Sequence, residues 1–288
     1  MSFRVTVPCT RAQGEAVAAL DDVLTGAVIV ADEPDPSRPD EWLIHAYFEQ
    51  PPSADELAAL RSLGSGEPRI EELAESDWVT MSQSGLQPIR AGRFTVHTPM
   101  FPPEDERINF EIDASLAFGT GQHATTSGCL EALDRLERQG KCFANIADVG
   151  TGTGLLAFAA LALWPEAKCI ATDIDPVAVE VARDNAAINR VKLGHGAGEL
   201  LLAQADGMDS PLLSARAPFD LIVANILAGP LVELAPAFAK ALAAGGSIVL
   251  AGLLDTQAAA VAHAYEAEGL VLRDAGFGEW PVLVCKRA

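Results

Sequence analysis

The stretch that decides the fold is residues 147–156, "ADVGTGTGLL", where an apolar strand pattern runs directly into three glycines and then into a helix pattern. Gly150, Gly152 and Gly154 allow a tight turn, and they let a ligand approach main-chain N–H groups at the start of the helix. The alternative is a glycine-rich turn that binds nothing. The stretch therefore predicts a strand-turn-helix unit with a candidate ligand site at its turn.

Two ligand classes use such a loop, dinucleotides and S-adenosylmethionine, and the glycine spacing separates them. A dinucleotide loop reads G-x-G-x-x-G or G-x-G-x-x-A, but here Gly154 comes one position early and Leu155 takes the expected place. Asp148, next to the loop, would also repel a pyrophosphate. A carboxylate is suited instead to the ammonium group of an amino acid, so these residues favour S-adenosylmethionine.

The next strand pattern ends in "ATDIDP", residues 171–176, and places Asp173 23 residues beyond Gly150. In a βαβ unit a carboxylate at this distance accepts hydrogen bonds from the two ribose hydroxyls. Both ligand classes contain a ribose, so Asp173 indicates a nucleoside without naming it. Asp175 is better explained as the N-cap of a helix that starts at Pro176.

Strand and helix patterns alternate from Phe94 onward, as is typical of α/β proteins. Residues 270–287 hold two strand patterns with no helix between them, which predicts an antiparallel hairpin at the edge of the sheet.

The first 75 residues have a different order, strand, helix, strand, strand, helix, strand, in which Ser53 and Gly64 bound the second helix. This order predicts a small ferredoxin-like α+β domain over residues 1–75. Residues 76–90 lack a clean period and are expected to form a linker, so that the second domain spans residues 91–288.

The charge balance bears on possible partners. The chain has 40 acidic and 20 basic residues, a formal net charge of −20. Tight binding to nucleic acid relies on clustered Lys and Arg that displace counterions, so no direct tight nucleic-acid binding is expected. The same charge favours solubility and would attract a basic partner.

The cysteines and histidines form no recognisable site. Five of each are dispersed along the chain without a C-x-x-C pair or zinc-ligand spacing, so no metal is predicted and a reducing, cytoplasmic compartment is expected. The N-terminus shows no signal-peptide pattern, and Gly, Pro or charged residues break every apolar window before membrane-spanning length. No membrane partner is therefore expected.

Two further stretches are more specific than the glycine loop: "LAFGTGQHATTSGCLEALD" at residues 116–134 and "VANILAGP" at residues 223–230. Together with the glycine loop, "ATDIDP" and "IVLAGLLDTQ", they resemble the methyltransferase of large-subunit ribosomal protein eleven, a class I S-adenosylmethionine-dependent family. The resemblance covers roughly residues 75–288, and the first domain is similar in pattern only. It implies an α/β fold of the class I methyltransferase type, a Rossmann-like, seven-stranded doubly wound sheet.

The resemblance also implies the site residues. Thr126 would contact the methionine part of S-adenosylmethionine, and Gly150 and Gly152 would lie in the loop beneath the cofactor. Asp173 would bind the ribose, and Asn225 would lie beside the methyl donor. The first domain would hold the substrate, large-subunit ribosomal protein eleven, whose lysine and N-terminal amines would be methylated. We separately expect a monomer.

An amine acceptor sets a chemical requirement. A lysine amine has an ordinary pKa of about 10.4, so freeing its lone pair near neutral pH costs about 4.6 kcal/mol. An apolar mouth would lower that pKa, and the carbonyl oxygen of Asn225 could accept a hydrogen bond from the amine and aim the lone pair at the methyl group. The alternative for Asn225 is to cap the following helix.

Two other functions stay open from the sequence. One is a class I methyltransferase that acts on another protein or a small amine, and the other is a non-catalytic S-adenosylmethionine-binding module. His123 could contact the substrate or bond to the backbone as a loop histidine, and Asp206 carries no assigned role.

Overall fold

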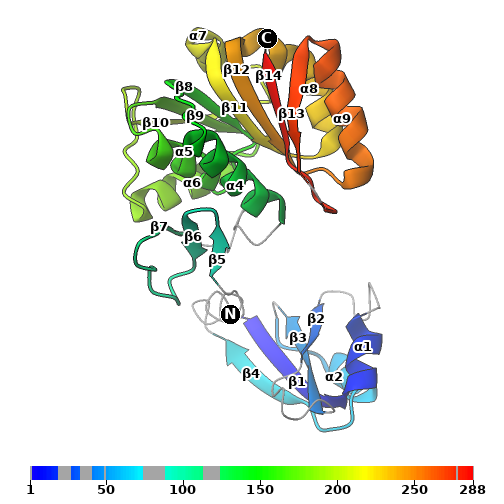
Figure 1. The fold of residues 1–288 in the computed structure, drawn as a ribbon. Coiled ribbons are helices and arrows are strands. Elements are labelled where there is room, and N and C mark those ends of the chain that lie inside the picture. The colour runs from blue at the N-terminus through cyan, green and yellow to red at the C-terminus, as the bar shows by residue number, and fades with distance from the viewer. Residues whose placement is uncertain are drawn as a thin grey trace. The chain divides into compact units, whose positions relative to one another are not determined.

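The computed structural model describes residues 2–18, 27–32, 41–48, 50–73, 88–112, 124–276 and 278–287. The chain divides into two compact units, residues 1–85 and 86–288 (Figure 1). This division falls inside residues 76–90, the range expected to form a linker. Residues 76–87 lie outside the described part, and a short strand, β5 (Ile89–Ala91), already includes the last two residues of that range.

The first unit has one four-stranded antiparallel sheet. Its neighbours run in the order β2-β3-β1-β4, which is the ferredoxin-like arrangement predicted from the order of its elements. The elements are β1 (Ser2–Thr10), α1 (Arg11–Ala18), β2 (Ala27–Asp32), β3 (Glu41–Phe48), α2 (Ala54–Leu63) and β4 (Arg69–Leu73).

Alternation along β1 and β3 produces the core of this unit. Val5 and Val7 of β1 pack with Ile44 and Ala46 of β3, and Leu60 of α2 covers them. Helix α2 begins with a capping box, in which Ser53 Oγ accepts a hydrogen bond from the Glu56 N–H and the Glu56 carboxylate accepts one from the Ser53 N–H. The predicted N-cap at Ser53 is therefore confirmed.

The second unit is built on a seven-stranded sheet with the order β10-β9-β8-β11-β12-β14-β13. Only the pairs that involve β14 are antiparallel. The predicted doubly wound sheet and its antiparallel edge hairpin are thus confirmed. The strands are β8 (Asn145–Val149), β9 (Lys168–Asp173), β10 (Leu200–Gln204), β11 (Phe219–Asn225), β12 (Leu242–Ala251), β13 (Leu270–Ala275) and β14 (Leu283–Arg287).

Helices cover both faces of this sheet (Figure 1). The first face carries α4 (Ala124–Arg138), α5 (Leu155–Leu163) and α6 (Pro176–Ile188). The second carries α7 (Pro211–Arg216), α8 (Ala228–Ala241) and α9 (Asp255–Ala267). Along β11, Leu221 and Val223 pack on the first face, whereas Ile222 and Ala224 pack on the second. Burial on both sides explains why this strand reads as a continuous apolar run.

The order of the strands fixes where a ligand crevice lies. The chain moves outward from β8 through β9 to β10, then returns to β11 on the other side of β8. The carboxyl ends of β8 and β11 therefore flank the switch point of the sheet, where open α/β folds bind their ligands.

A small sheet of three strands, which the sequence did not predict, precedes α4. It is formed by β5, β6 (Phe94–His97) and β7 (Ile108–Glu111). Phe94 and Phe110 join the core beside α4 and α5, so the small sheet is part of the second unit.

Two general features concern the described residues only. None of their helices combines the length and apolar character needed to cross a bilayer. No three of their His, Cys, Asp or Glu side chains are grouped so that they could hold a metal ion.

Candidate functional site

The glycine loop connects β8 to α5 through backbone conformations that only glycine adopts readily. Gly150, Gly152 and Gly154 have φ angles of 77°, 54° and 86°. The N–H groups of Gly150 and Thr151 donate to the carbonyl oxygen of Thr172 on β9, at 2.8 and 2.9 Å. These bonds hold the loop at the carboxyl ends of two neighbouring strands.

Glycine is also required at Gly150, and at Gly252 outside the loop, because Ile226 lies against both backbones. A Cβ atom on Gly150 would lie 2.2 Å from Ile226 Cγ2, and one on Gly252, just after β12, would lie 2.3 Å from the Ile226 carbonyl oxygen. Ile226 directly follows Asn225 in the chain. The position of Asn225 is therefore set by close packing with the glycine loop on one side and with the end of β12 on the other.

Asp173 links the glycine loop to the end of β9. Its Oδ2 atom accepts a hydrogen bond from the Gly152 N–H at 2.9 Å, and its Oδ1 atom accepts one from the Asp175 N–H at 3.1 Å. The two predicted residues Gly152 and Asp173 are therefore in direct contact. A carboxylate has about four lone-pair sites, so each oxygen can still accept a bond from a ribose hydroxyl.

Asn225 and Thr126 also meet. Asn225 is the last residue of β11, and its Nδ2 group donates a hydrogen bond to Thr126 Oγ1 at 3.1 Å. Thr126 lies in the first turn of α4 and is 2% exposed. Within the described part of the chain, the side-chain oxygen of Asn225, Oδ1, accepts no hydrogen bond. It thus remains available as an acceptor for a bound group.

The alternative of Asn225 as a helix cap is wrong. The N-cap residue of α8 is Leu227, and no side chain caps this helix. The amide of Asn225 points instead at α4, on the face of the sheet that carries the glycine loop's own helix. By contrast, the predicted cap of α6 is confirmed, because Asp175 Oδ1 accepts a hydrogen bond from the Val177 N–H at 2.8 Å.

Asp148 helped to distinguish the two ligand classes in the sequence, but it was not predicted to be a site residue. It is 1% exposed, and its Oδ2 accepts a hydrogen bond from Thr151 Oγ1 at 2.6 Å. Burial raises the pKa of Asp148 to about 7, and the nearby charge of Asp173 adds to the rise, whereas the Thr151 hydrogen bond and a weaker contact with the Ala157 backbone N–H oppose it. Its Oδ1 is buried with no hydrogen-bond partner among the described residues.

The orphaned oxygen of Asp148 provides a test of whether the predicted cofactor fits. A buried carboxylate oxygen without a partner is costly unless a bound group satisfies it. An ammonium group, as in the methionine part of S-adenosylmethionine, would supply both hydrogen-bond donors and the opposite charge. A phosphate at the same place would be repelled. The residues present therefore fit an aminoacyl nucleoside better than a dinucleotide.

Other residues that the sequence singles out lie apart from this site or outside the described part of the chain. Residues 113–123, which include His123, are not among the described residues. Asp206 is exposed in a turn after β10 and remains without a role.

Comparison with known proteins identifies similar chains. Residues 5–288 match the sequence profile of a family described as Ribosomal protein L11 methyltransferase (PrmA). A protein named ribosomal protein L11 methyltransferase from Brucella suis is 48% identical over 233 residues, which cover 79% of this chain and 78% of the relative. One of the same name from Chelativorans sp. is 47% identical over 208 residues, covering 72% and 69%.

A solved structure is similar as well. The crystal structure of ribosomal protein L11 methylase from Lactobacillus delbrueckii subsp. bulgaricus matches with a TM-score of 0.56 and 27% sequence identity. The match covers 68% of this chain and 94% of that one. The agreement extends to the seven-stranded sheet on which the candidate site is built.

Proposed function

Because the chain belongs to the ribosomal protein L11 methyltransferase family, we propose that it transfers methyl groups from S-adenosylmethionine to the lysine side-chain and N-terminal amines of ribosomal protein L11. When bound, S-adenosylmethionine supplies a methyl group on a positively charged sulfur. The protein's own task is to hold the cofactor, remove the acceptor amine from water and orient it.

The observation that carries this proposal is the hydrogen bond between Asn225 and Thr126 beside the glycine loop. This hydrogen bond uses the side-chain nitrogen of Asn225, Nδ2, and leaves the side-chain oxygen, Oδ1, free to accept a hydrogen bond from an amine N–H. An amine held in this way presents its lone pair in a fixed direction. An in-line displacement requires alignment of this kind. Because the reaction forms no new anion, the protein does not also have to stabilise one.

Residues at the ends of two strands and in the first turn of α4 hold the cofactor. Asp173 binds the ribose hydroxyls, and Gly150 and Gly152 let the cofactor lie against the main chain. Thr126 contacts the methionine part. Asp148 is added to this set, because its buried, unpartnered Oδ1 suits the cofactor's ammonium group.

An exposed apolar side chain follows Asn225 in the chain. Leu227 is 74% exposed although it lies only two residues beyond Asn225. An exposed leucine beside a polar site can cover the aliphatic stem of a lysine and exclude water from its amine. Desolvation lowers the pKa of a lysine and so raises the fraction of neutral, nucleophilic amine.

The two units have different roles in this proposal. Residues 1–75 recognise the protein substrate, residues 76–90 connect the units, and residues 91–288 bind the cofactor. The enzyme acts as a cytoplasmic monomer without tight binding to nucleic acid. Its net charge of −20 would favour a basic substrate.

The test uses purified full-length protein, S-adenosylmethionine with a labelled methyl group, and ribosomal protein L11 that lacks methylation. We expect calorimetric binding of the cofactor and label in L11, with mass spectrometry placing the methyl groups on lysine and N-terminal amines. Label in another protein of a methylation-deficient lysate, but not in L11, would indicate a different acceptor. Cofactor binding with no labelled product would indicate a non-catalytic binding module.

A further inference from the structure

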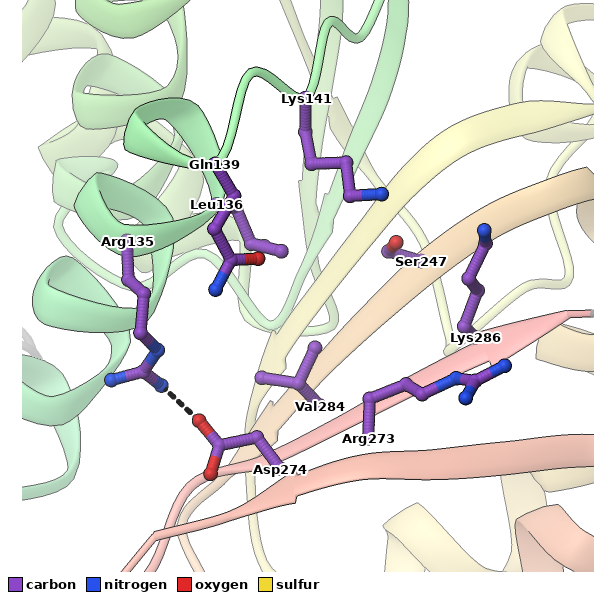
Figure 2. Close-up of a pocket in the computed structure, with 9 residues that line it drawn as sticks. All are labelled: Arg135, Leu136, Gln139, Lys141, Ser247, Arg273, Asp274, Val284 and Lys286. Carbon is purple, nitrogen blue, oxygen red and sulfur yellow. Dashed lines mark ion pairs between the residues drawn. The ribbon is translucent and has the colours of Figure 1, made fainter.

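A second concave site lies in the seven-stranded unit, away from the glycine loop. It is a pocket of about 400 Å³ between the end of α4 and strands β12, β13 and β14 (Figure 2). Ser247 of β12, which lines it, pairs with Leu221 near the start of β11, whereas Ala251 pairs with Asn225 at the end of β11. Ser247 and Ala251 are four residues apart along β12, so these two positions lie about 13 Å apart along the strand. The pocket thus lies toward the opposite end of the strands from Asn225.

Positive charge gathers around this pocket. Arg135 of α4, Lys141 just beyond α4, Arg273 of β13 and Lys286 of β14 all line it, and Asp274 is the only acidic residue among the lining side chains. Asp274 pairs with Arg135 at 2.5 Å. The other three cations, Lys141, Arg273 and Lys286, have no carboxylate at ion-pair distance among the described residues.

This gathering is unexpected in a chain with 40 acidic and 20 basic residues. Three like charges around one concavity repel one another, and carboxylates that could neutralise them are abundant elsewhere on the chain. A bound anion would remove that repulsion. The pocket is therefore much more basic than the overall composition would suggest.

The remaining walls also suit a ligand. Leu136 and Val284 are buried apolar side chains, and Ser247, 4% exposed, places a hydroxyl in the pocket. In Figure 2 the Lys141 side chain reaches toward Ser247, and Lys286 stands on the other side of that serine. The lining therefore offers ammonium, guanidinium and hydroxyl donors, and a group with several acceptor oxygens could use more than one of them.

We propose that this pocket binds a compact anion with a diphosphate group, either free or as part of a nucleotide. A phosphate monoester carries about −1.5 to −2 charges near neutral pH, so two linked phosphates approach the three uncompensated positive charges. Arginine and lysine are the usual partners of phosphate oxygens. The volume lies within the range of small-molecule sites.

A compact ligand fits better than a nucleic acid. An RNA strand that placed one phosphate in this pocket would carry its neighbouring phosphates over a protein with a net charge of −20. Binding of long polyanions depends on an extended basic surface. A small anion needs only the cations of the pocket.

The experiment is calorimetric titration of the full-length protein with inorganic pyrophosphate, ADP and a short single-stranded RNA, at constant ionic strength. We expect pyrophosphate to bind and Lys286→Gln to weaken that binding roughly tenfold, the loss of one charge-assisted contact. Arg273→Gln should have a similar effect. ADP binding that is equally sensitive to Lys286→Gln would show that the pocket accepts a nucleotide, and ADP that fails to bind would limit it to free diphosphate.

The matched control is Lys240→Gln, which removes the same charge from the exposed surface of α8 on the other face of the sheet. This variant should bind pyrophosphate within twofold of the wild type. Unchanged S-adenosylmethionine binding by Lys286→Gln would show that the variant is folded. The proposal is overturned if pyrophosphate does not bind, if Lys240→Gln weakens binding as much as Lys286→Gln, or if only RNA binds.

Discussion

Asn225 Nδ2 donates a hydrogen bond to Thr126 Oγ1 at 3.1 Å, across 99 positions of sequence. The bond joins the end of β11 to the first turn of α4, and with the amide nitrogen on Thr126 the side-chain oxygen lies on the other side of the carboxamide. An unpaired amide could rotate and exchange its donor for its acceptor. With the nitrogen held by Thr126, the oxygen is the atom presented to an acceptor amine.

Replacing Asn225 by alanine should therefore reduce catalysis more than cofactor binding. We expect the rate of methyl transfer at saturating cofactor to fall roughly 100-fold, the scale of losing alignment of reacting groups. The dissociation constant of S-adenosylmethionine should change only a few-fold. Methyl-transfer assays and calorimetry on the same preparation measure the two quantities, and a parallel loss of both would mean that Asn225 mainly holds the cofactor.

Thr126 should act partly through Asn225. Thr126→Val keeps the shape but removes the acceptor of the hydrogen bond, so we expect about a tenfold lower rate, whereas Thr126→Ser should stay close to wild type. In a double-mutant cycle with Asn225→Ala, the two losses should not add, because they remove the same contact. Fully additive effects would show that the two side chains act independently.

The stability of the protein should depend on pH through Asp148. Burial raises the pKa of this carboxyl from 3.8 to about 7, so the folded state binds a proton more tightly than the unfolded state. Its stabilising contribution is complete below the unfolded pKa and is lost as the pH rises through about 7. Relative to Asp148→Asn, the free energy of unfolding in urea should therefore fall by a few kcal/mol between about pH 4 and pH 8. A constant difference between the two proteins would contradict this.

Cofactor binding should show the opposite trend with pH. If the ammonium of S-adenosylmethionine pairs with the Asp148 carboxylate, binding requires that the proton leave, and affinity should rise as the pH passes through about 7. The rise should approach tenfold per pH unit on the acidic side and level off on the basic side. Calorimetry in buffers of different ionisation enthalpy would detect the released proton. Asp148→Asn should bind weakly at every pH and release none.

Asp173→Asn should weaken cofactor binding with little change in the rate at saturation. The asparagine has a single acceptor oxygen, so it cannot keep both the Gly152 and the Asp175 hydrogen bonds and also serve two ribose hydroxyls. We expect at least a tenfold higher dissociation constant and a loss of stability of about 1 kcal/mol. Asp206→Asn, a change of the same type in an exposed turn, is the matched control.

The parts of the fold that the sequence predicted well are those governed by local chemistry. The start of α5 follows from the glycines before it, and that of α6 from Asp175 and Pro176. The start of β12 was less predictable. The residues "LAAGG" look like the end of a helix, yet the strand begins at Leu242, which pairs with Phe219 of β11. A partner strand, rather than local propensity, decides that boundary.

The site was only partly accessible from sequence. The contact between Thr126 and Asn225 cannot be derived from their spacing, because no local sequence feature encodes how α4 packs on β11. Only the family resemblance placed both residues beside the cofactor. No sequence pattern predicted the cationic pocket. Its cations are single residues in separate segments, such as Arg273 and Lys286 on neighbouring strands, and the acidic composition masks them.

The packing of Ile226 between the backbones of Gly150 and Gly252 has a consequence for how this enzyme can change. In a survey of all single substitutions, Gly252 should score as badly as Asn225, although it has no side chain with which to do chemistry. A substitution there would displace the Ile226 carbonyl and the asparagine before it. At this edge of the sheet, residues that only support the site would therefore tolerate substitution as poorly as residues that take part in the reaction.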